Sequence, residues 1–252
     1  MNIMKKLSPI SILCIGILFA SVFLSCESKT KTLDDSLFGY EYYPLEIGKY
    51  WVYQLDSTII DDQGAKIIKS KNYIREEVTD SYLNEENETI FKIQRSISDS
   101  LYGTYRITDI WTAEMTETAA FRVEENLRFI KMVFPVNLDK SWVGNLFDNL
   151  TQVDVAGEKI WVYKDWGEYR IDQYGVDRQI NGKLYKDVVK VEQADHDFAI
   201  ERRFSVEYYA ANIGMIEREM VIFDTQCECP GQTWEQKADS GFTLRQTLLE
   251  TN

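Results

Sequence analysis

The feature of this sequence that most constrains its fold is a series of short segments in which apolar and polar residues alternate. A period of two places the apolar side chains on one face of a β-strand. No segment after residue 25 carries a long apolar stripe at helical spacing, although residues 124–132 could form a short helix. The alternating apolar residues are Trp51, Tyr53 and Leu55; Phe91, Ile93 and Ile97; Phe121 and Val123; Val189 and Val191; and Phe242, Leu244 and Leu248.

Turn-forming residues separate these segments. They are Gln63-Gly64, Asn84 to Asn87, Tyr102-Gly103, Ala156-Gly157, Asn181-Gly182, Asn212 to Gly214, Pro230-Gly231 and Ser240-Gly241. Asn181-Gly182 is the strongest signal, because a two-residue type I′ hairpin turn needs a positive φ at both positions. The spacing predicts an all-β fold of about a dozen antiparallel strands in a strongly curved sheet, a half-barrel or a barrel.

Two ten-residue segments, 43–52 and 134–143, resemble each other. Both have an aromatic residue, Pro, an aliphatic residue, any residue, an aliphatic residue, Gly or Asp, Lys, any residue, Trp and Val. The pattern describes a turn followed by a strand that Trp leads, with the proline before the ladder, where no N–H is needed. Convergence on a common turn would also produce it. The ungapped match favours a duplicated β unit, with halves at about 39–132 and 133–252.

Residues 1–25 have the order of a secretory signal peptide. Lys5 and Lys6 precede an apolar run from Ile10 to Leu24, and the small residue Ser25 follows. This run is shorter than the roughly 20 apolar residues that cross a membrane comfortably. The sequence therefore predicts a segment that is removed.

The end of this segment resembles a lipobox, the motif after which a cysteine receives a diacylglyceryl group and becomes the new N-terminus. Ser25 and Cys26 match that motif, and Phe23 replaces its usual leucine. An ordinary secretory signal with an incidental cysteine is the alternative. Stable attachment to a membrane takes more than one acyl chain, and the diacylglyceryl group on Cys26 would supply two. Lipid on Cys26 would therefore anchor the protein firmly.

Charge limits what the mature chain can bind. The full chain has a formal net charge of −13, and removal of Lys5 and Lys6 with the signal peptide makes it −15. An acidic protein repels phosphate backbones and anionic head groups, so we expect no nucleic acid partner and membrane contact through the lipid alone. Residues 26–38 are polar and patternless, as in a flexible tether, and 39–252 are long enough for a single β domain.

Two cysteines, Cys227 and Cys229, lie in a turn-like stretch before Pro230-Gly231. A disulfide across one residue is awkward, because extended residues two apart lie near the limit of Cα separation. A local disulfide, free thiols, a redox pair and half of a metal site all remain open. The spacing is not C-x-x-C and there is no second ligand pair, which favours local structure or free thiols.

Candidate catalytic groups are few. The only histidine, His196, stands between Asp195 and Asp197, and a carboxylate beside an imidazole could form a general base or a metal site. A solvated turn is the simpler interpretation, and no G-x-S-x-G motif nominates a nucleophile. Paired carboxylates of a glycoside hydrolase could come from three acidic doublets, Asp34-Asp35, Asp61-Asp62 and Glu76-Glu77. Surface solvation and protection of edge strands explain these doublets more simply.

The six tryptophans accompany fifteen tyrosines and twelve phenylalanines. Such rings could stack on sugars or line a groove for an acyl chain, although most belong in a β core. Trp161 and Trp166 are the candidate ligand contacts, because aromatic and polar residues alternate around them in a loop-like setting.

Three segments, 42–51, 134–142 and 208–216, together with the predicted lipidated cysteine, make the chain similar to cell-envelope lipoproteins of Bacteroidota bacteria. The resemblance implies an outer-membrane or periplasmic lipoprotein of β architecture, with a sheet related to the half-barrels of periplasmic lipoprotein carriers. It implies no functional residue beyond Cys26.

The sequence therefore predicts a lipid-anchored cell-envelope protein that acts as a non-catalytic binding or structural module, without a cofactor or a metal. Its ligand would be a protein, a glycan or a lipid. A carrier with an apolar cavity in a curved sheet is one alternative. An envelope hydrolase with a carboxylate and histidine site is another.

Overall fold

The structure is a computed structural model that describes residues 37–61, 64–155 and 158–252. The chain divides into two units, Met1–Asp34 and Asp35–Asn252, and all described residues belong to the second. The predicted signal peptide, Cys26 and nearly all of the predicted tether lie outside the described residues.

The described residues are almost entirely β structure, which confirms the all-β prediction. Twelve strands form one sheet, two form a separate hairpin, and the helical elements are one short 3-10 turn and one four-residue helix. In chain order the elements are η3 (Tyr40–Tyr42), β1 (Tyr50–Asp61), β2 (Lys66–Leu83), β3 (Thr89–Ser98), β4 (Arg106–Met115), β5 (Ala119–Glu124), β6 (Leu127–Val133), β7 (Ser141–Trp142), β8 (Val153–Val155), β9 (Glu158–Ile160), β10 (Tyr169–Ile180), β11 (Lys183–Asp197), β12 (Glu201–Ala210), β13 (Gly214–Asp224), α2 (Trp234–Lys237) and β14 (Ser240–Thr251).

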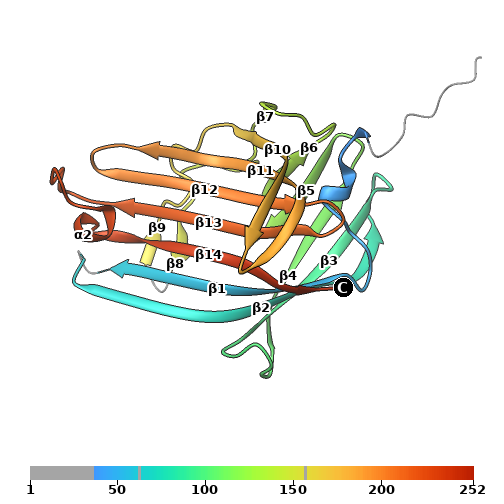
Figure 1. The fold of residues 1–252 in the computed structure, drawn as a ribbon, viewed down its shortest axis with the longest axis horizontal. Coiled ribbons are helices and arrows are strands. Elements are labelled where there is room, and N and C mark those ends of the chain that lie inside the picture. The colour runs from blue at the N-terminus through green and yellow to red at the C-terminus, as the bar shows by residue number, and fades with distance from the viewer. Residues whose placement is uncertain (1–36, 62–63, 156–157) are drawn as a thin grey trace, which may run out of the picture. The chain divides into compact units, whose positions relative to one another are not determined.

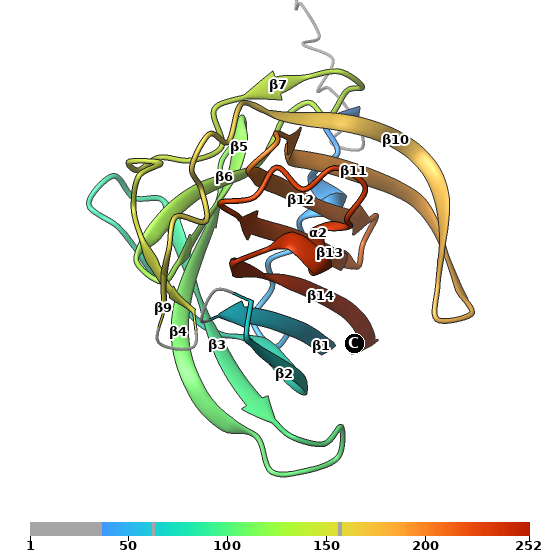
Figure 2. The same ribbon diagram turned by 90° about the vertical axis from the view of Figure 1, so that its left-hand side faces the viewer.

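The large sheet is antiparallel and joins two six-stranded meanders in the order β6-β5-β4-β3-β2-β1-β14-β13-β12-β11-β10-β7 (Figures 1 and 2). Its two edges, β6 and β7, approach each other. Phe129 forms a bridge with Asn145, and the amide N–H of Ile130 donates to the carbonyl of Gly144 at 2.8 Å. The sheet is therefore nearly closed as a barrel.

The two similar ten-residue segments adopt the same local structure. Gly48 has φ +90° and Asp139, at the equivalent position, has φ +60°. Their amide groups donate to the carbonyls of Val78 and Ile171, at 2.8 and 2.9 Å, and each of those residues returns an N–H bond to the lysine that follows. Each segment thus docks onto a strand of the sheet, β2 or β10, through one paired set of backbone hydrogen bonds.

The tryptophan at the ninth position of each segment is buried and fixed in the same way. The indole N–H of Trp51 donates to the carbonyl of Ile213 at 2.6 Å, and that of Trp142 donates to the carbonyl of Ile130 at 2.9 Å. The strand order is consistent with the repeat. Read from the edge at β7, the sheet contains β7 and β10 to β14, followed by β1 to β6, and each set is in chain order.

Two local predictions are wrong. Residues 124–132 form no helix but a hairpin of β5 and β6, because Glu125 and Asn126 adopt positive φ angles of 50° and 65°. Gly241 is not a turn residue but lies within β14 with φ +127°, where a Cβ atom would collide with the carbonyl oxygen of Ile222.

The hairpin turn at Asn181-Gly182 is confirmed. Their φ angles are 49° and 80°, and the flanking residues Ile180 and Lys183 are paired in the ladder between β10 and β11. Both signs match a type I′ turn. The predicted turn at Ala156-Gly157 lies outside the described residues.

The interior of the barrel is not simply apolar. Along β12 the inward-facing side chains are Glu201, Arg203, Ser205, Glu207 and Tyr209, and all five are buried. Because side chains alternate along a strand, these five share one face. Charged groups on that face must find partners inside the protein, since burying an unpaired charge is costly. Their partners define two polar sites.

Candidate ligand-binding site

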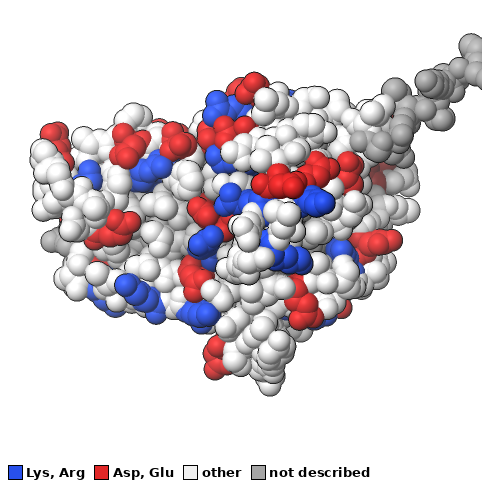
Figure 3. Space-filling view, in the orientation of Figure 1, with Lys and Arg blue, Asp and Glu red and all other residues white. Residues whose placement is uncertain are grey.

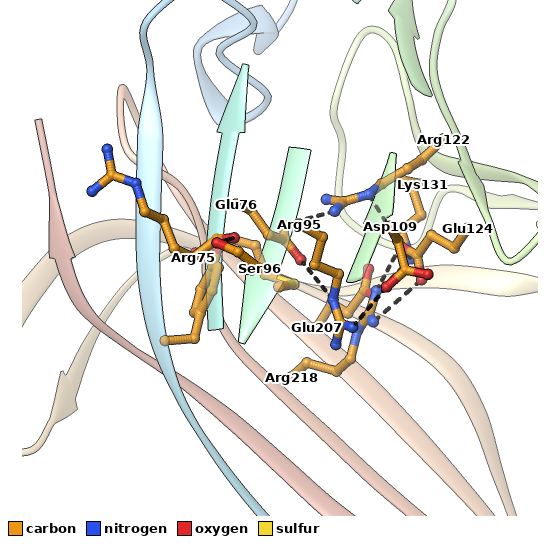
Figure 4. A network of polar contacts seen from close by, with 12 residues as sticks. Arg75, Glu76, Arg95, Ser96, Asp109, Arg122, Glu124, Lys131, Glu207 and Arg218 are labelled. Carbon is orange, nitrogen blue, oxygen red and sulfur yellow. Dashed lines mark hydrogen bonds and ion pairs between the residues drawn. The ribbon is translucent and has the colours of Figure 1, made fainter. Parts of the chain in front are cut away.

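The first polar site is an interior ion cluster of eight side chains, shown in Figure 4. Lys131 donates to Glu207 at 2.7 Å, and the Nε of Arg218 donates to the same carboxylate at 2.7 Å. Arg122 donates to a second carboxylate, Glu76, at 2.7 Å. Four acids and four cations make the cluster charge-balanced. Its members are Glu76, Arg95, Asp109, Arg122, Glu124, Lys131, Glu207 and Arg218.

Electrostatics within the cluster keep two of its carboxylates, Glu124 and Glu207, ionised. Burial alone would raise the pKa of Glu207, but the nearby Arg218 and Lys131 outweigh it and lower that pKa from 4.5 to about 2. The same two cations, against the same effect of burial, hold the pKa of Glu124 well below its usual range. The cluster is therefore a fixed set of ion pairs at neutral pH.

The pocket beside this cluster is too small for an organic ligand. Tyr43, Trp51, Arg122 and Tyr209 are among its lining residues, and its volume is about 20 Å³. That is room for one water molecule. Side chains thus fill this part of the barrel, where a carrier of apolar ligands would need a cavity.

The second polar site is an open pocket where β12 begins and β13 ends, which we name the end pocket. Its volume is about 340 Å³. The register sets Glu201 opposite Asp224, and the segment after β9 reaches the same place. Its lining residues are Gln152, Lys159, Ile160, Trp161, Lys164, Ile200, Glu201, Arg203, Asp224, Thr225, Gln226 and Ser240.

Two ion pairs hold the charged groups of the end pocket in place. Lys164 donates to Glu201 at 2.6 Å, and this contact raises the pKa of the lysine. Arg203 donates to Asp224 at 2.7 Å and to the carbonyl of Phe223 at 2.8 Å. Arg203 is fully buried, yet its Nε–H has no hydrogen-bond partner among the described residues. This Nε atom has no exposed surface, so the groups of Arg203 that the protein binds are its two terminal nitrogens.

The two predicted ligand-contact tryptophans have different places. Trp161 lines the end pocket and is 43% exposed. Trp166 is 6% exposed and packs edge-on against Tyr163, with ring centroids 4.9 Å apart, and against Tyr169 at 6.1 Å. Trp166 is thus packed in the core, because the segment around it folds back onto the barrel.

His196 does not lie in a solvated turn, as predicted, but within β11. Its Nε2 atom is 3.6 Å from Glu201 and has no hydrogen-bond partner, and burial lowers its pKa from 6.5. The flanking Asp195 and Asp197 contact Arg202 instead, at 2.8 and 4.0 Å. The candidate grouping of Asp195, His196 and Asp197 is therefore split between the two faces of the strand.

The acidic doublets do not converge among the described residues. Glu76 joins the interior ion cluster, whereas Glu77 faces the other side of β2 and pairs with Arg75 at 3.1 Å. Asp61 ends β1 and lies 3.5 Å from Lys66. Its neighbour Asp62 and the doublet Asp34-Asp35 lie outside the described residues.

Cys227 and Cys229 form a disulfide in the loop after β13, with their Cα atoms 5.2 Å apart. The predicted difficulty of this spacing holds for an extended chain. Here Cys229 adopts φ +24° and its carbonyl accepts from Gln232, so the chain turns at the second cysteine. In the part of the chain that the structure describes, no group of three His, Cys, Asp or Glu side chains could hold a metal ion.

Acidic and basic side chains are intermixed on the outer face seen in Figure 3. Glu217 in β13 is fully buried and is bound by two arginines: Arg178 donates to it through Nε at 2.8 Å, and Arg245 through Nε at 2.9 Å. The face therefore shows no broad patch of one charge. None of the described helices is long and apolar enough to span a membrane.

Sequence reasoning did not select Glu201, Arg203 or Lys164. A signal for the first two exists, because charged residues alternate at Glu201, Arg203 and Glu207 in a strand that is otherwise mainly apolar. Charges at every second position of such a strand indicate a polar interior. Lys164 carries no comparable signal.

Comparison with known proteins gives no family. No protein-family model and no curated protein matches the chain. Two solved structures were found. One, from Parabacteroides distasonis and assigned as a lipoprotein, has 11% identity and a TM-score of 0.34, and the match covers 84% of this chain and 98% of the other. The second, from Vibrio parahaemolyticus and assigned as a domain of an outer-membrane lipoprotein-sorting protein, has 7% identity and a TM-score of 0.22, with 81% and 85% covered. Neither likeness is strong enough to support an argument.

Proposed function

We propose that this chain is a lipid-anchored protein of the cell envelope, at the outer membrane, that acts as a non-catalytic binding module. The observation that carries the binding role is the end pocket, an open recess of about 340 Å³ that is lined by a half-exposed tryptophan and by polar side chains. The pocket lies within the usual range for small-ligand sites, about 300–1,000 Å³. The nearly closed barrel forms its frame.

Two features of the described residues favour binding over catalysis. His196 makes no hydrogen bond to a hydroxyl or thiol that it could activate, since its Nε2 is unpartnered and faces Glu201. The carboxylates of the end pocket are each paired with a cation. A paired, ionised carboxylate is a poor general acid. The hydrolase alternative therefore finds no support in this geometry.

The anchor rests on the sequence, because Cys26 lies outside the described residues. Its support is the charged start, the apolar run and the Ser25-Cys26 junction, together with an acidic body that anionic lipids repel. Lipid on Cys26 would hold such a protein at a membrane surface through its acyl chains.

A pair of cysteine variants tests the anchor. Cys26→Ala should abolish incorporation of radiolabelled palmitate and move the protein out of the membrane fraction, or leave an uncleaved precursor. Cys14→Ala is the matched control, because Cys14 lies within the predicted signal peptide and should change neither result. Density-gradient separation of the membranes then checks the outer-membrane assignment. A Cys26→Ala protein that still takes up label would refute lipidation at this residue.

A further inference from the structure

We propose that the end pocket binds an uncharged sugar, an inference that rests on the proposed role as a binding module and names its ligand class. The observation behind it is the combination of one accessible aromatic ring with hydrogen-bonding groups of both kinds. A sugar ring has an apolar C–H face and an edge of hydroxyl groups. A site for it therefore needs a flat apolar surface beside donors and acceptors.

Trp161 supplies the flat surface. It is 43% exposed and lines the pocket, whereas Trp51, Trp111, Trp142 and Trp166 are all less than 10% exposed. A single exposed apolar residue is ordinary on a protein surface. Trp161 differs because it stands beside a recess, so a ligand in the recess could cover its ring.

Uncharged polar side chains supply hydrogen-bonding groups of both kinds. Gln152, Gln226 and Ser240 line the pocket, and an amide or hydroxyl side chain can both donate and accept. A sugar hydroxyl can pair with either. The unpartnered Nε–H of Arg203 is not counted among these groups, because that atom is itself buried.

The charge of the pocket selects against ionic ligands. Glu201 and Asp224 line it together with three cations, and each of the two acids is already paired with one of those cations. Lys159, the third cation, lies 3.9 Å from Asp154, so a charged ligand would have to compete with an existing ion pair at each cation. A hydroxyl group donates as well as accepts, so an uncharged sugar satisfies both kinds of group.

The pocket also selects against an acyl chain. Only Ile160, Trp161 and Ile200 among its lining residues have large apolar side chains, and the rest are polar or charged. An apolar chain would strip water from those polar groups without replacing their hydrogen bonds. The modest volume, about 340 Å³, suits one or two sugar rings.

The test is a calorimetric and NMR titration of the full lipoprotein, extracted in a zwitterionic detergent because alkyl glycosides carry the class of head group under test. The probes are glucose, galactose, mannose, N-acetylglucosamine, maltose, cellobiose and lactose, with glucuronate as the charged counterpart and octanoate as the apolar one. We expect at least one neutral sugar to bind at millimolar concentration and more tightly than glucuronate or octanoate.

Trp161→Ala should weaken that binding at least about tenfold, and Trp161→Phe should weaken it less, because a smaller ring remains. Tyr102→Ala is the matched control: Tyr102 is 90% exposed, lies in the loop between β3 and β4, and is not part of the pocket. Its binding should equal that of the unmodified protein. Circular dichroism spectra confirm that each variant is folded.

The inference is overturned if no neutral sugar binds, if glucuronate or octanoate binds more tightly, or if Trp161→Ala binds as well as Tyr102→Ala. These outcomes are independent of the anchor. If the unmodified protein carries palmitate on Cys26 but binds no sugar, the ligand class alone is rejected. If it binds a sugar but carries no lipid, the anchor alone is rejected.

Discussion

The interior ion cluster should stabilise the barrel only while it stays charge-balanced, and Glu207→Gln tests this. Glutamine keeps the shape of the side chain but removes the charge that faces Lys131 and Arg218, both at 2.7 Å. The fall in the pKa of Glu207 from 4.5 to about 2 corresponds to roughly 3 kcal/mol of stability at neutral pH. Removal of one partner from a buried ion pair typically costs about 3–5 kcal/mol.

The assay is urea unfolding followed by circular dichroism, supported by thermal melts. A loss of about 3–5 kcal/mol should lower the melting temperature by roughly 6–20 °C for a domain of this size. Asp80→Asn is the matched control, because Asp80 pairs with Lys92 at 2.9 Å but both side chains are exposed. An exposed pair contributes little, so this variant should unfold almost like the unmodified protein.

The stability that Glu207 contributes should depend on pH, and the direction of its pKa shift gives the sign of that dependence. Because folding depresses the pKa of Glu207, its contribution is complete above about pH 4.5 and is lost as the pH falls toward 2. The difference between Glu207→Gln and the unmodified protein should therefore shrink across that range. Adding Lys131→Met to Glu207→Gln should recover part of the loss, since the charges balance again. A loss below about 1 kcal/mol at pH 7, or one that does not shrink in acid, would refute the reasoning.

Two further measurements test the backbone and the histidine. Gly241→Ala should cost more than about 4 kcal/mol or prevent folding, because the new Cβ would collide with the carbonyl of Ile222. Gly182→Ala, which meets open space at φ +80°, should cost only roughly 1–2 kcal/mol; equal losses in urea unfolding would contradict this. The imidazole of His196, the only histidine, should titrate below pH 6.5 by NMR. Its contribution to stability is then complete above pH 6.5 and lost as the pH falls, and a titration at or above 6.5 would disprove burial as the dominant effect.

The fold was predictable because its signals are local. Alternation at residues such as Trp51 and Tyr53 fixes which face of a strand is buried, and Asn181-Gly182 fixes a turn, whatever the rest of the chain does. The helix predicted at 124–132 is wrong because this segment carries no clear local signal. The positive φ angles of Glu125 and Asn126, which form the turn there, cannot be inferred from a pattern of apolar residues.

The site was much less predictable, because it depends on residues distant in sequence. Trp161 was selected from its composition alone, and the same reasoning selected Trp166, which is buried. What separates them is the way residues 160–166 fold back onto β12, where Lys164 meets Glu201. Glu207 likewise meets Lys131 only across the barrel, 76 positions away. Such pairings are set by strand order, which a single sequence does not reveal.

The position of β14 has a consequence for how this sheet can be assembled. β14 lies between β1 and β13, and the hydroxyl of Thr251 donates to the carbonyl of Tyr50, 201 positions earlier. During synthesis, or export through a narrow channel, the first six strands would emerge with the edge of β1 bare. The barrel could close only once residues 240–251 arrived. The sheet would thus stay open until nearly the whole chain had emerged.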